Sequence, residues 1–348
     1  MAAVESTCSP LLGIFANEYK ASRRDSYDRV AKLLNQFGFI ITPVPPYSFS
    51  LTVRKPAGWS LFNQSEVYED GVLWTATRMD GVLIGVRLRS SGTVERPRIH
   101  VTVFSRMVLD RKHQARAKVL LTKALGADQD IMEFYKMAGK DGILRHVVAD
   151  LYGMHDTFSP TLFSEAVLAI LLQMAPLKRS NEMMAAFVDN YGDTVEFDGK
   201  RIKAWPAPEG MAGVTETELA TNCKVGYRAR SIIKLAAKMS GGGFPTAEQL
   251  EEMGADNARA LLLELPGIGD YSADIINPHG GFPIDVWSAE VFGKLFFGRE
   301  PRNNRLAVER VKKEGLRRWG GWSWMAFFYV VQDLEGLSRK LGIRLRLA

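Results

Sequence analysis

The spacing of hydrophobic positions changes along the chain, and this change predicts how the chain is organised. Between residues 45 and 105, apolar and polar residues alternate, as is typical of strands that bury one face. The alternating runs are YSFSLTVR, VLWTATRM, VLIGVRLR and RIHVTVF, and the turn-forming pairs Asp70-Gly71, Asp80-Gly81 and Ser91-Gly92 lie between them. This part of the chain is therefore expected to form a four-stranded antiparallel sheet.

Helical spacing of hydrophobic residues replaces the alternation after residue 105. A helix is expected over 105–125, and shorter helices are expected over 130–138, 143–152, 161–174, 178–191, 215–220, 227–240 and 246–253. Residues 192–213 contain the run WPAPEG and are expected to form an irregular connection. Residues 25–37, ahead of the first alternating run, also show helical spacing.

These patterns together predict an α+β fold in three parts. Residues 1–44 are expected to be an N-terminal extension with one helix, residues 45–125 an antiparallel α+β domain, and residues 126–348 an all-helical domain. A chain of 348 residues, of which 46% are hydrophobic, is long enough to build more than one core.

Charge and cysteine content exclude some classes of protein. The 45 Lys and Arg residues exceed the 39 Asp and Glu residues, which gives a net charge of +6 and fits a polyanionic partner. Cys8 and Cys223 alone cannot form a disulfide framework or a four-cysteine zinc or iron–sulfur site within one chain. The first residues lack the regions of a secretion signal, and no apolar run reaches the roughly 18 residues of a membrane span. We therefore expect an intracellular protein, in the cytoplasm, nucleoid or nucleus, without membrane contact.

Residues 262–276 predict two helices joined by a tight turn. A helix-forming run ends at Leu265, the turn Pro266-Gly267-Ile268-Gly269 follows, and the Asp270 side chain is expected to cap the next helix. The two glycines permit positive φ angles and let a nucleic-acid backbone come close, because they have no Cβ. Amide N–H groups at the turn would then face a phosphate. Such a helix-hairpin-helix binds DNA, and it also occurs in proteins without catalysis.

A carboxylate follows this hairpin. The loop Gly281-Phe282-Pro283-Ile284-Asp285 ends in an acid just before the next expected helix. Hairpin, loop and acid in this order resemble the signature of the DNA glycosylase superfamily that includes endonuclease III, 8-oxoguanine DNA glycosylase and bacterial 3-methyladenine DNA glycosylase II. The runs FSEAVLAILLQM, CKVGYRARSI and SWMAFFYVVQD resemble further segments of these enzymes, and residues 47–105 resemble the antiparallel N-terminal domain of the last two. The resemblance covers most of residues 45–335.

The resemblance implies that Asp285 is the catalytic residue. A glycosylase breaks an N-glycosidic bond through a transition state in which the sugar resembles an oxocarbenium ion. A nearby carboxylate stabilises that charge and orients or deprotonates a water. An Asp at a helix start is also a common N-cap, and one residue can have both roles.

Tyr271 occupies the position where bifunctional members of the superfamily have a lysine. That lysine amine attacks the sugar and forms a Schiff base that leads to strand cleavage, which a phenol cannot do. The resemblance therefore implies an enzyme without lyase activity, in which water is the nucleophile. Tyr271 is expected either to contact the flipped base or to face the core. The two cysteines exclude the iron–sulfur cluster of the endonuclease III branch.

The expected base pocket departs from the pockets of both relatives. By resemblance, its positions are Tyr271, Ile275, Trp287, Trp324, Tyr329 and Val331. Ile275 and Val331 stand where the alkylation enzyme has aromatic rings that stack on cationic bases. Ala326 stands where the 8-oxoguanine enzyme has its pocket glutamine. Neither pocket is reproduced.

The resemblance also assigns positions on a DNA-binding surface. These are Gln173, Met174, Tyr227, Arg228, Pro266, Gly267, Ile268 and Gly269. Met174 is apolar and flexible and is expected to fill the gap that a flipped base leaves, with a place in the core as the alternative. The main-chain carbonyls of Leu263, Leu265 and Ile268 match those that coordinate a monovalent cation, Na+ or K+, in relatives. No other cofactor is expected.

The sequence thus predicts a monomeric, monofunctional DNA glycosylase that acts on double-stranded DNA in base excision repair. It is expected to resemble 3-methyladenine DNA glycosylase II most and to release an alkylated or deaminated base with Asp285. Two alternatives remain open. One is a glycosylase for an oxidised purine such as 8-oxoguanine, and the other is a non-catalytic DNA-damage binding protein whose base pocket has been lost.

Overall fold

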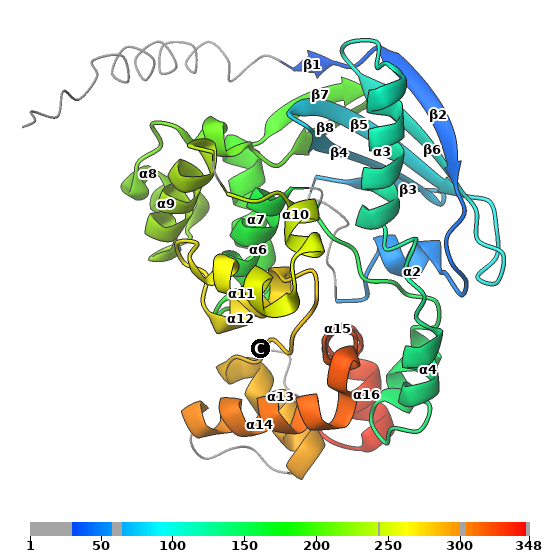
Figure 1. The fold of residues 1–348 in the computed structure, drawn as a ribbon, viewed down its shortest axis with the longest axis vertical. Coiled ribbons are helices and arrows are strands. Elements are labelled where there is room, and N and C mark those ends of the chain that lie inside the picture. The colour runs from blue at the N-terminus through cyan, green and yellow to red at the C-terminus, as the bar shows by residue number, and fades with distance from the viewer. Residues whose placement is uncertain (1–29, 58–64, 160, 243, 299–303, 346–348) are drawn as a thin grey trace, which may run out of the picture.

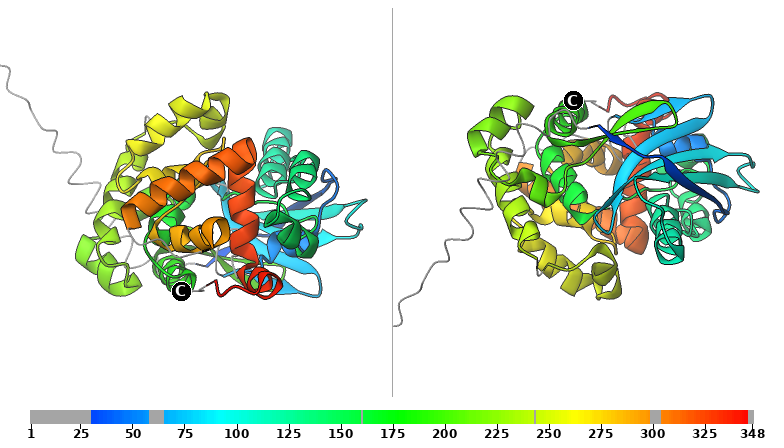
Figure 2. Two further views of the ribbon diagram at one scale, coloured as in Figure 1. Left: turned by 90° about the horizontal axis from the view of Figure 1, so that it is seen from below. Right: turned by 90° about the horizontal axis from the view of Figure 1, so that it is seen from above.

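The molecule has two parts, one built around a sheet and the other built mainly of helices. The computed structural model describes residues 30–57, 65–159, 161–242, 244–298 and 304–345. Strands collect at one side and a group of helices lies beside them, with further helices below (Figure 1). The views from below and above show the same separation (Figure 2). The α+β fold class is therefore confirmed.

A five-stranded antiparallel sheet forms the first part. Its strands are β2 (Asn35–Ile41), β3 (Val67–Glu69), β4 (Val72–Met79), β5 (Val82–Ser90) and β6 (Ile99–Ser105), in the order β2-β6-β5-β4-β3. Leu73 pairs with Leu88 and Val86 with Val103, so buried residues face one another across the strands. Helix α3 (Arg111–Ala124) packs its apolar side on this sheet. At the β4–β5 turn, Asp80 and Gly81 have φ angles of 48° and 80°, as the Asp-Gly pair predicts.

Two predictions for this part are wrong. The expected helix over 25–37 lies partly outside the described residues, and its described end enters β2, an edge strand of the sheet. The run YSFSLTVR contains helix α2 (Phe49–Val53) in place of a strand. Ser48 caps this helix, because its side chain accepts a hydrogen bond from the Leu51 N–H at 3.5 Å. In both runs apolar residues are too closely spaced for the period to distinguish a strand from a short helix.

A second, smaller sheet shows that residues 126–348 are not all helical. Strands β7 (Asp193–Phe197) and β8 (Lys200–Ala204) form a hairpin, and the short β1 (Ala31–Lys32) pairs with β7 in parallel. The hairpin turns at Asp198 and Gly199, whose φ angles are 50° and 72°. Strand β8 lies against β4, and the Phe197 ring covers Gly85, where a Cβ would come within 2.5 Å of that ring.

The remaining chain forms helices around two hydrophobic cores. They are α4 (Met132–Ala138), α5 (Leu144–Asp150), α6 (Leu162–Leu172), α7 (Leu177–Tyr191), α8 (Glu216–Cys223), α9 (Arg228–Ser240), α10 (Ala247–Glu252), α11 (Ala255–Leu263), α12 (Asp270–Ile276), α13 (Val286–Phe297), α14 (Asn304–Trp319), α15 (Ser323–Gln332) and α16 (Leu334–Leu341). One core surrounds α6, which packs against α7, α9 and α12, and the other surrounds α15. Within the described residues, no helix combines the length and the apolar character that a membrane span requires.

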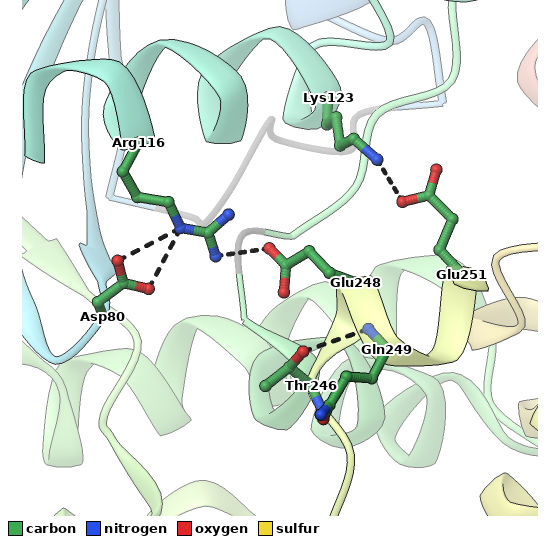
Figure 3. Close-up of polar contacts among 7 residues, drawn as sticks. All are labelled: Asp80, Arg116, Lys123, Thr246, Glu248, Gln249 and Glu251. Atoms are coloured by element: carbon green, nitrogen blue, oxygen red, sulfur yellow. Dashed lines mark hydrogen bonds and ion pairs between the residues drawn. The ribbon is translucent and has the colours of Figure 1, made fainter. Parts of the chain in front are cut away.

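Ion pairs connect α3 of the sheet part to α10 of the helical part (Figure 3). The Arg116 guanidinium binds Glu248 at 2.6 Å and Asp80 at 3.3 Å, and Lys123 pairs with Glu251. Thr246 starts α10 with a capping box that it shares with Gln249. These groups are partly exposed, and such pairs are worth at most about 1 kcal/mol each. These ion pairs therefore fix the orientation of α10 but contribute little to the stability of the contact between the two parts.

Candidate active site and DNA-binding surface

The predicted helix-hairpin-helix is present between α11 and α12. Gly267 has a φ angle of 83°, and a Cβ on it would lie 2.5 Å from the Ser231 Cβ. The Ile268 N–H donates to the Leu265 carbonyl at 3.1 Å and closes the turn. Gly267 and Gly269 are both exposed, and nothing lies within 4 Å of a Cβ built on Gly269. The turn is thus open to a DNA backbone on the Gly269 side.

The predicted cap of the second helix is wrong by one residue. Gly269 is the N-cap of α12, and Asp270 is the first residue inside the helix without a side-chain capping bond. The Asp270 carboxylate pairs with Arg259 on α11, and this contact lowers its pKa. Arg259 also binds the buried Asp274 at 3.2 Å. The cation on α11 therefore holds the two helices of the hairpin against each other.

Asp285 lies at the start of α13 and is both a helix cap and a cavity residue. Its Oδ1 accepts hydrogen bonds from the Ser288 N–H and the Ser288 hydroxyl, each at 2.8 Å. Among the described residues, none donates a hydrogen bond to its Oδ2. The half-buried side chain lines a cavity of about 870 Å³. Hydrogen bonds to Oδ1 fix the side chain beside the cavity.

This cavity lies between the two helical cores. Five of the six expected pocket residues line it together with Asp285: Tyr271 and Ile275 from α12, Trp287 from α13, and Trp324 and Val331 from α15. Burial and, to a smaller extent, the charge of Asp285 raise the pKa of Tyr271 above its ordinary value. The phenol therefore stays neutral beside the carboxylate.

Tyr329 does not belong to the cavity. It is fully buried in the core around α15, where its hydroxyl lies 2.8 Å from that of Tyr135. Phe327 lines the cavity instead, on the same face of α15 as Trp324 and Val331. Positions three and four apart share a helix face, whereas Tyr329 is turned away from it.

A cluster of buried polar groups at the cavity has no counterpart in the sequence predictions. The Lys55 amine binds the Thr157 hydroxyl, and the Trp324 indole N–H donates to Asp156 at 2.6 Å. Burial lowers the pKa of Lys55 to about 8, raises that of Glu165 to about 8 and raises that of Asp156. Lys55, Asp156 and Glu165 all line the cavity. Lys55 is distant in the chain from Asp156 and Glu165, and no local pattern marks the cluster.

The end of α6 places Met174 at the surface. Met174 has a φ angle of 48°, and 63% of it is exposed. The Gln173 amide donates to the Gly267 carbonyl and to the Ser272 hydroxyl, both at 2.7 Å. Gln173 thus ties the end of α6 to the hairpin, and Met174 projects beside it. Met174 is therefore not in the core.

Tyr227 and Arg228 differ in exposure. Tyr227 is 67% exposed, whereas Arg228 is buried and its guanidinium donates to the Ile170 carbonyl at 3.2 Å and to the Gln173 carbonyl. Burial lowers the pKa of Arg228. The Arg228 guanidinium satisfies the last carbonyls of α6, and the DNA contact expected at Arg228 stays a prediction.

The hairpin carbonyls fit the expected monovalent cation in their chemistry. Peptide oxygens of Leu263, Leu265 and Ile268 are hard donors, and the Leu265 oxygen keeps a second lone pair beyond its bond to Ile268. No group of three or more His, Cys, Asp or Glu side chains suited to a metal ion occurs within the described part of the chain.

Comparison with known proteins agrees with this geometry. No protein-family model matches the chain. A DNA-3-methyladenine glycosylase of Bacillus subtilis is 27% identical over 212 residues, which are 58% of this chain and 67% of that protein. The chain is thus similar to DNA glycosylases that contain a helix-hairpin-helix, a class of enzyme that acts in base excision repair.

Solved structures of DNA glycosylases share its fold. A 3-methyladenine DNA-glycosylase of Archaeoglobus fulgidus superposes with a TM-score of 0.67 at 20% identity, over 88% of this chain and 100% of that one. A second structure is that of an 8-oxoguanine glycosylase/lyase of Clostridium acetobutylicum in complex with DNA containing cytosine opposite 8-oxoguanine. It superposes with a TM-score of 0.65 at 16% identity, over 89% of this chain and 99% of that one. At these identities the similarity establishes the fold alone.

Proposed function

We propose that this protein is a DNA glycosylase that flips a damaged base out of duplex DNA into the cavity and hydrolyses its N-glycosidic bond with Asp285. The observation that supports this most is the Asp285 carboxylate, fixed by Ser288 through one oxygen and facing a cavity of about 870 Å³. A cavity of several hundred Å³ holds one nucleobase, and a carboxylate at its wall stabilises the positive charge of the sugar.

The reaction is a substitution at C1′ of the deoxyribose. The bond from C1′ to the base nitrogen breaks, and its electron pair leaves with the base. Asp285 stabilises the cationic sugar and orients a water, whose oxygen then bonds to C1′. The water loses its proton to the carboxylate or to the departing base. The products are a free base and an abasic site.

A panel of duplexes, each with one lesion, tests this function. The lesions are 1-methyladenine, 3-methyladenine, hypoxanthine, uracil and 8-oxoguanine, and the measurement is release of the free base. Release of at least one of them is expected. Tight binding to a lesion duplex without release from any of them would show a non-catalytic damage binder instead.

Water as the nucleophile predicts that borohydride traps no covalent adduct with DNA. Tyr271 cannot form the Schiff base that a lysine forms, and its raised pKa keeps it neutral. The measurement is a gel shift after incubation with lesion DNA and borohydride. Of the two lysines that line the cavity, Lys55 and Lys178, Lys55 is the first to control for, because burial lowers its pKa to about 8. An efficient adduct that disappears in Lys55→Met would contradict hydrolysis by water alone.

Met174 is proposed to fill the gap in the duplex. It is exposed and lies next to Gln173, which binds the hairpin, so an apolar side chain projects from the surface that also presents the phosphate-binding turn. Met174→Ala is expected to slow base release about tenfold, because the flipped state loses the contact that replaces stacking. Single-turnover kinetics measure this. Met107→Ala, at another exposed methionine, is the matched control. Equal rates in both variants would exclude the role.

A monovalent cation at the Leu263, Leu265 and Ile268 carbonyls is part of the proposal. When bound, it would offset part of the negative charge of a phosphate at the hairpin. The turn amides and this cation would hold the DNA backbone beside the cavity. The monomeric state remains a prediction.

A further inference from the structure

Two buried hydrogen-bond donors at the cavity have no acceptor. They are the Gln332 amide nitrogen Nε2 and the Trp287 indole nitrogen Nε1, and neither finds a partner within the described residues. Both residues line the cavity, and Gln332 is only 3% exposed. Buried polar groups are almost always paired, so an unpaired donor at a binding cavity indicates a ligand that supplies the acceptor.

The orientation of the Gln332 amide is fixed by the protein. The Ala57 N–H donates to Gln332 Oε1 at 3.1 Å. This contact uses the oxygen and leaves the NH₂ group as the unpaired half of the amide. Lys55, two residues before Ala57, lines the same cavity and adds a second donor group beyond its bond to Thr157.

Two acidic side chains near Lys55, Asp156 and Glu165, are already paired with protein donors. Asp156 accepts from the Trp324 indole at 2.6 Å and from the Thr157 N–H at 2.9 Å. Glu165 accepts from the Ser159 N–H, and burial raises its pKa to about 8, so it is largely protonated at neutral pH. Asp333, the residue after Gln332, also lines the cavity and has an unpaired oxygen, Oδ2, and burial raises the pKa of its carboxyl.

We propose that Gln332, assisted by Lys55, reads a keto oxygen of the flipped base, and that the glycosylase therefore selects neutral keto bases over cationic alkylated bases. This inference rests on the function proposed above and names the substrate class of the same site. A keto oxygen accepts from the amide NH₂ and from an ammonium group. A cationic base such as 1-methyladenine has no keto oxygen and is repelled by Lys55 when that amine is charged.

A DNA phosphate is a poorer occupant for these donors. Gln332 is almost fully buried at the C-terminal end of α15, and a phosphate would lose most of its hydration there. The exposed hairpin glycines offer the phosphate a hydrated site instead. A flat neutral base can enter the cavity at much lower cost.

Two substitutions at Gln332 test the proposal. Gln332→Glu keeps the acceptor for the Ala57 N–H and replaces the donor with a carboxyl oxygen, and Gln332→Met removes the donor at similar size. Release of hypoxanthine or 8-oxoguanine is expected to fall about 10- to 100-fold in both variants, since a buried acceptor on the base loses its partner. Release of 1-methyladenine is expected to stay equal or to rise in Gln332→Glu. Lys55→Met should lower release of the keto base in the same direction.

The controls separate this proposal from the general one. Gln114→Met, at a glutamine of α3 outside the cavity, should leave base selectivity unchanged, and thermal unfolding of every variant reports on folding. If the wild type releases only 1-methyladenine, or if both Gln332 variants release keto bases at the wild-type rate, the proposal is wrong and the glycosylase function stands. If the wild type releases no base, the proposed function itself fails, and this inference fails with it.

Discussion

Asp285→Asn is expected to lower base release by about 10³-fold, the range found when one electrostatic stabiliser of a transition state is removed. The amide is uncharged and stabilises the cationic sugar much less. Its oxygen still accepts from Ser288, and Asn is as good an N-cap as Asp, so α13 should remain intact. Single-turnover release of the base from a lesion duplex measures the first effect. Binding of the same duplex measures whether the site is still assembled.

The matched control for this substitution is Asp110→Asn. Asp110 caps α3 in the same way, with its Oδ1 accepting from the His113 N–H at 2.9 Å, and it does not line the cavity. Both variants should unfold at nearly the same temperature as the wild type. If Asp285→Asn kept full activity, or if both variants lost activity equally, Asp285 would not be the catalytic residue.

Gly267→Ala is expected to destabilise the protein by about 2 to 4 kcal/mol, the sum of a left-handed backbone penalty and a steric clash. The residue has a φ angle of 83°, and the new Cβ would lie 2.5 Å from the Ser231 Cβ on α9. The turn must then shift, and its amides lose the arrangement that binds a phosphate. Chemical denaturation measures the free energy of unfolding, and binding to undamaged duplex measures the loss of phosphate contact.

Gly269→Ala separates folding from DNA contact at the same turn. Its φ angle is −108°, and nothing lies within 4 Å of the added Cβ, so stability should change by less than about 1 kcal/mol. The methyl group nevertheless stands on the open side of the hairpin. Affinity for damaged and undamaged duplexes is expected to fall alike, because the turn contacts phosphate and not bases. Wild-type affinity in this variant would place the DNA elsewhere.

Local chemistry explains why the hairpin and the loop before Asp285 could be predicted from sequence. Glycine, proline and a capping acid constrain the backbone within a few residues, and the structure contains the turn at Gly267 and the cap at Asp285 where they are expected. The long apolar run of α6 is equally local, since eight of its eleven residues are buried. Such features depend little on the rest of the fold.

Contacts between distant segments explain what could not be predicted. Whether Tyr329 or Phe327 faces the cavity depends on the rotation of α15 against α13, which the sequence of α15 does not state. Lys55 and Gln332 are 277 residues apart in the chain and line the same cavity only in the folded protein. The hairpin at Asp198 and Gly199 has a clear turn signal and alternating residues on both sides, so local sequence is enough to predict it, and the expectation of an irregular connection over 192–213 is wrong.

The β7–β8 hairpin has a consequence for how the chain can be divided. It comes from the helical part, yet Val195 and Ile202 are buried with Ala76 and Phe104 of the large sheet, in one shared core. A fragment that begins after the large sheet would expose the apolar face of the β7–β8 hairpin. A fragment that ends after the large sheet would expose the sheet residues that this hairpin buries. The two parts are therefore expected to unfold together, and neither is expected to be stable when produced alone.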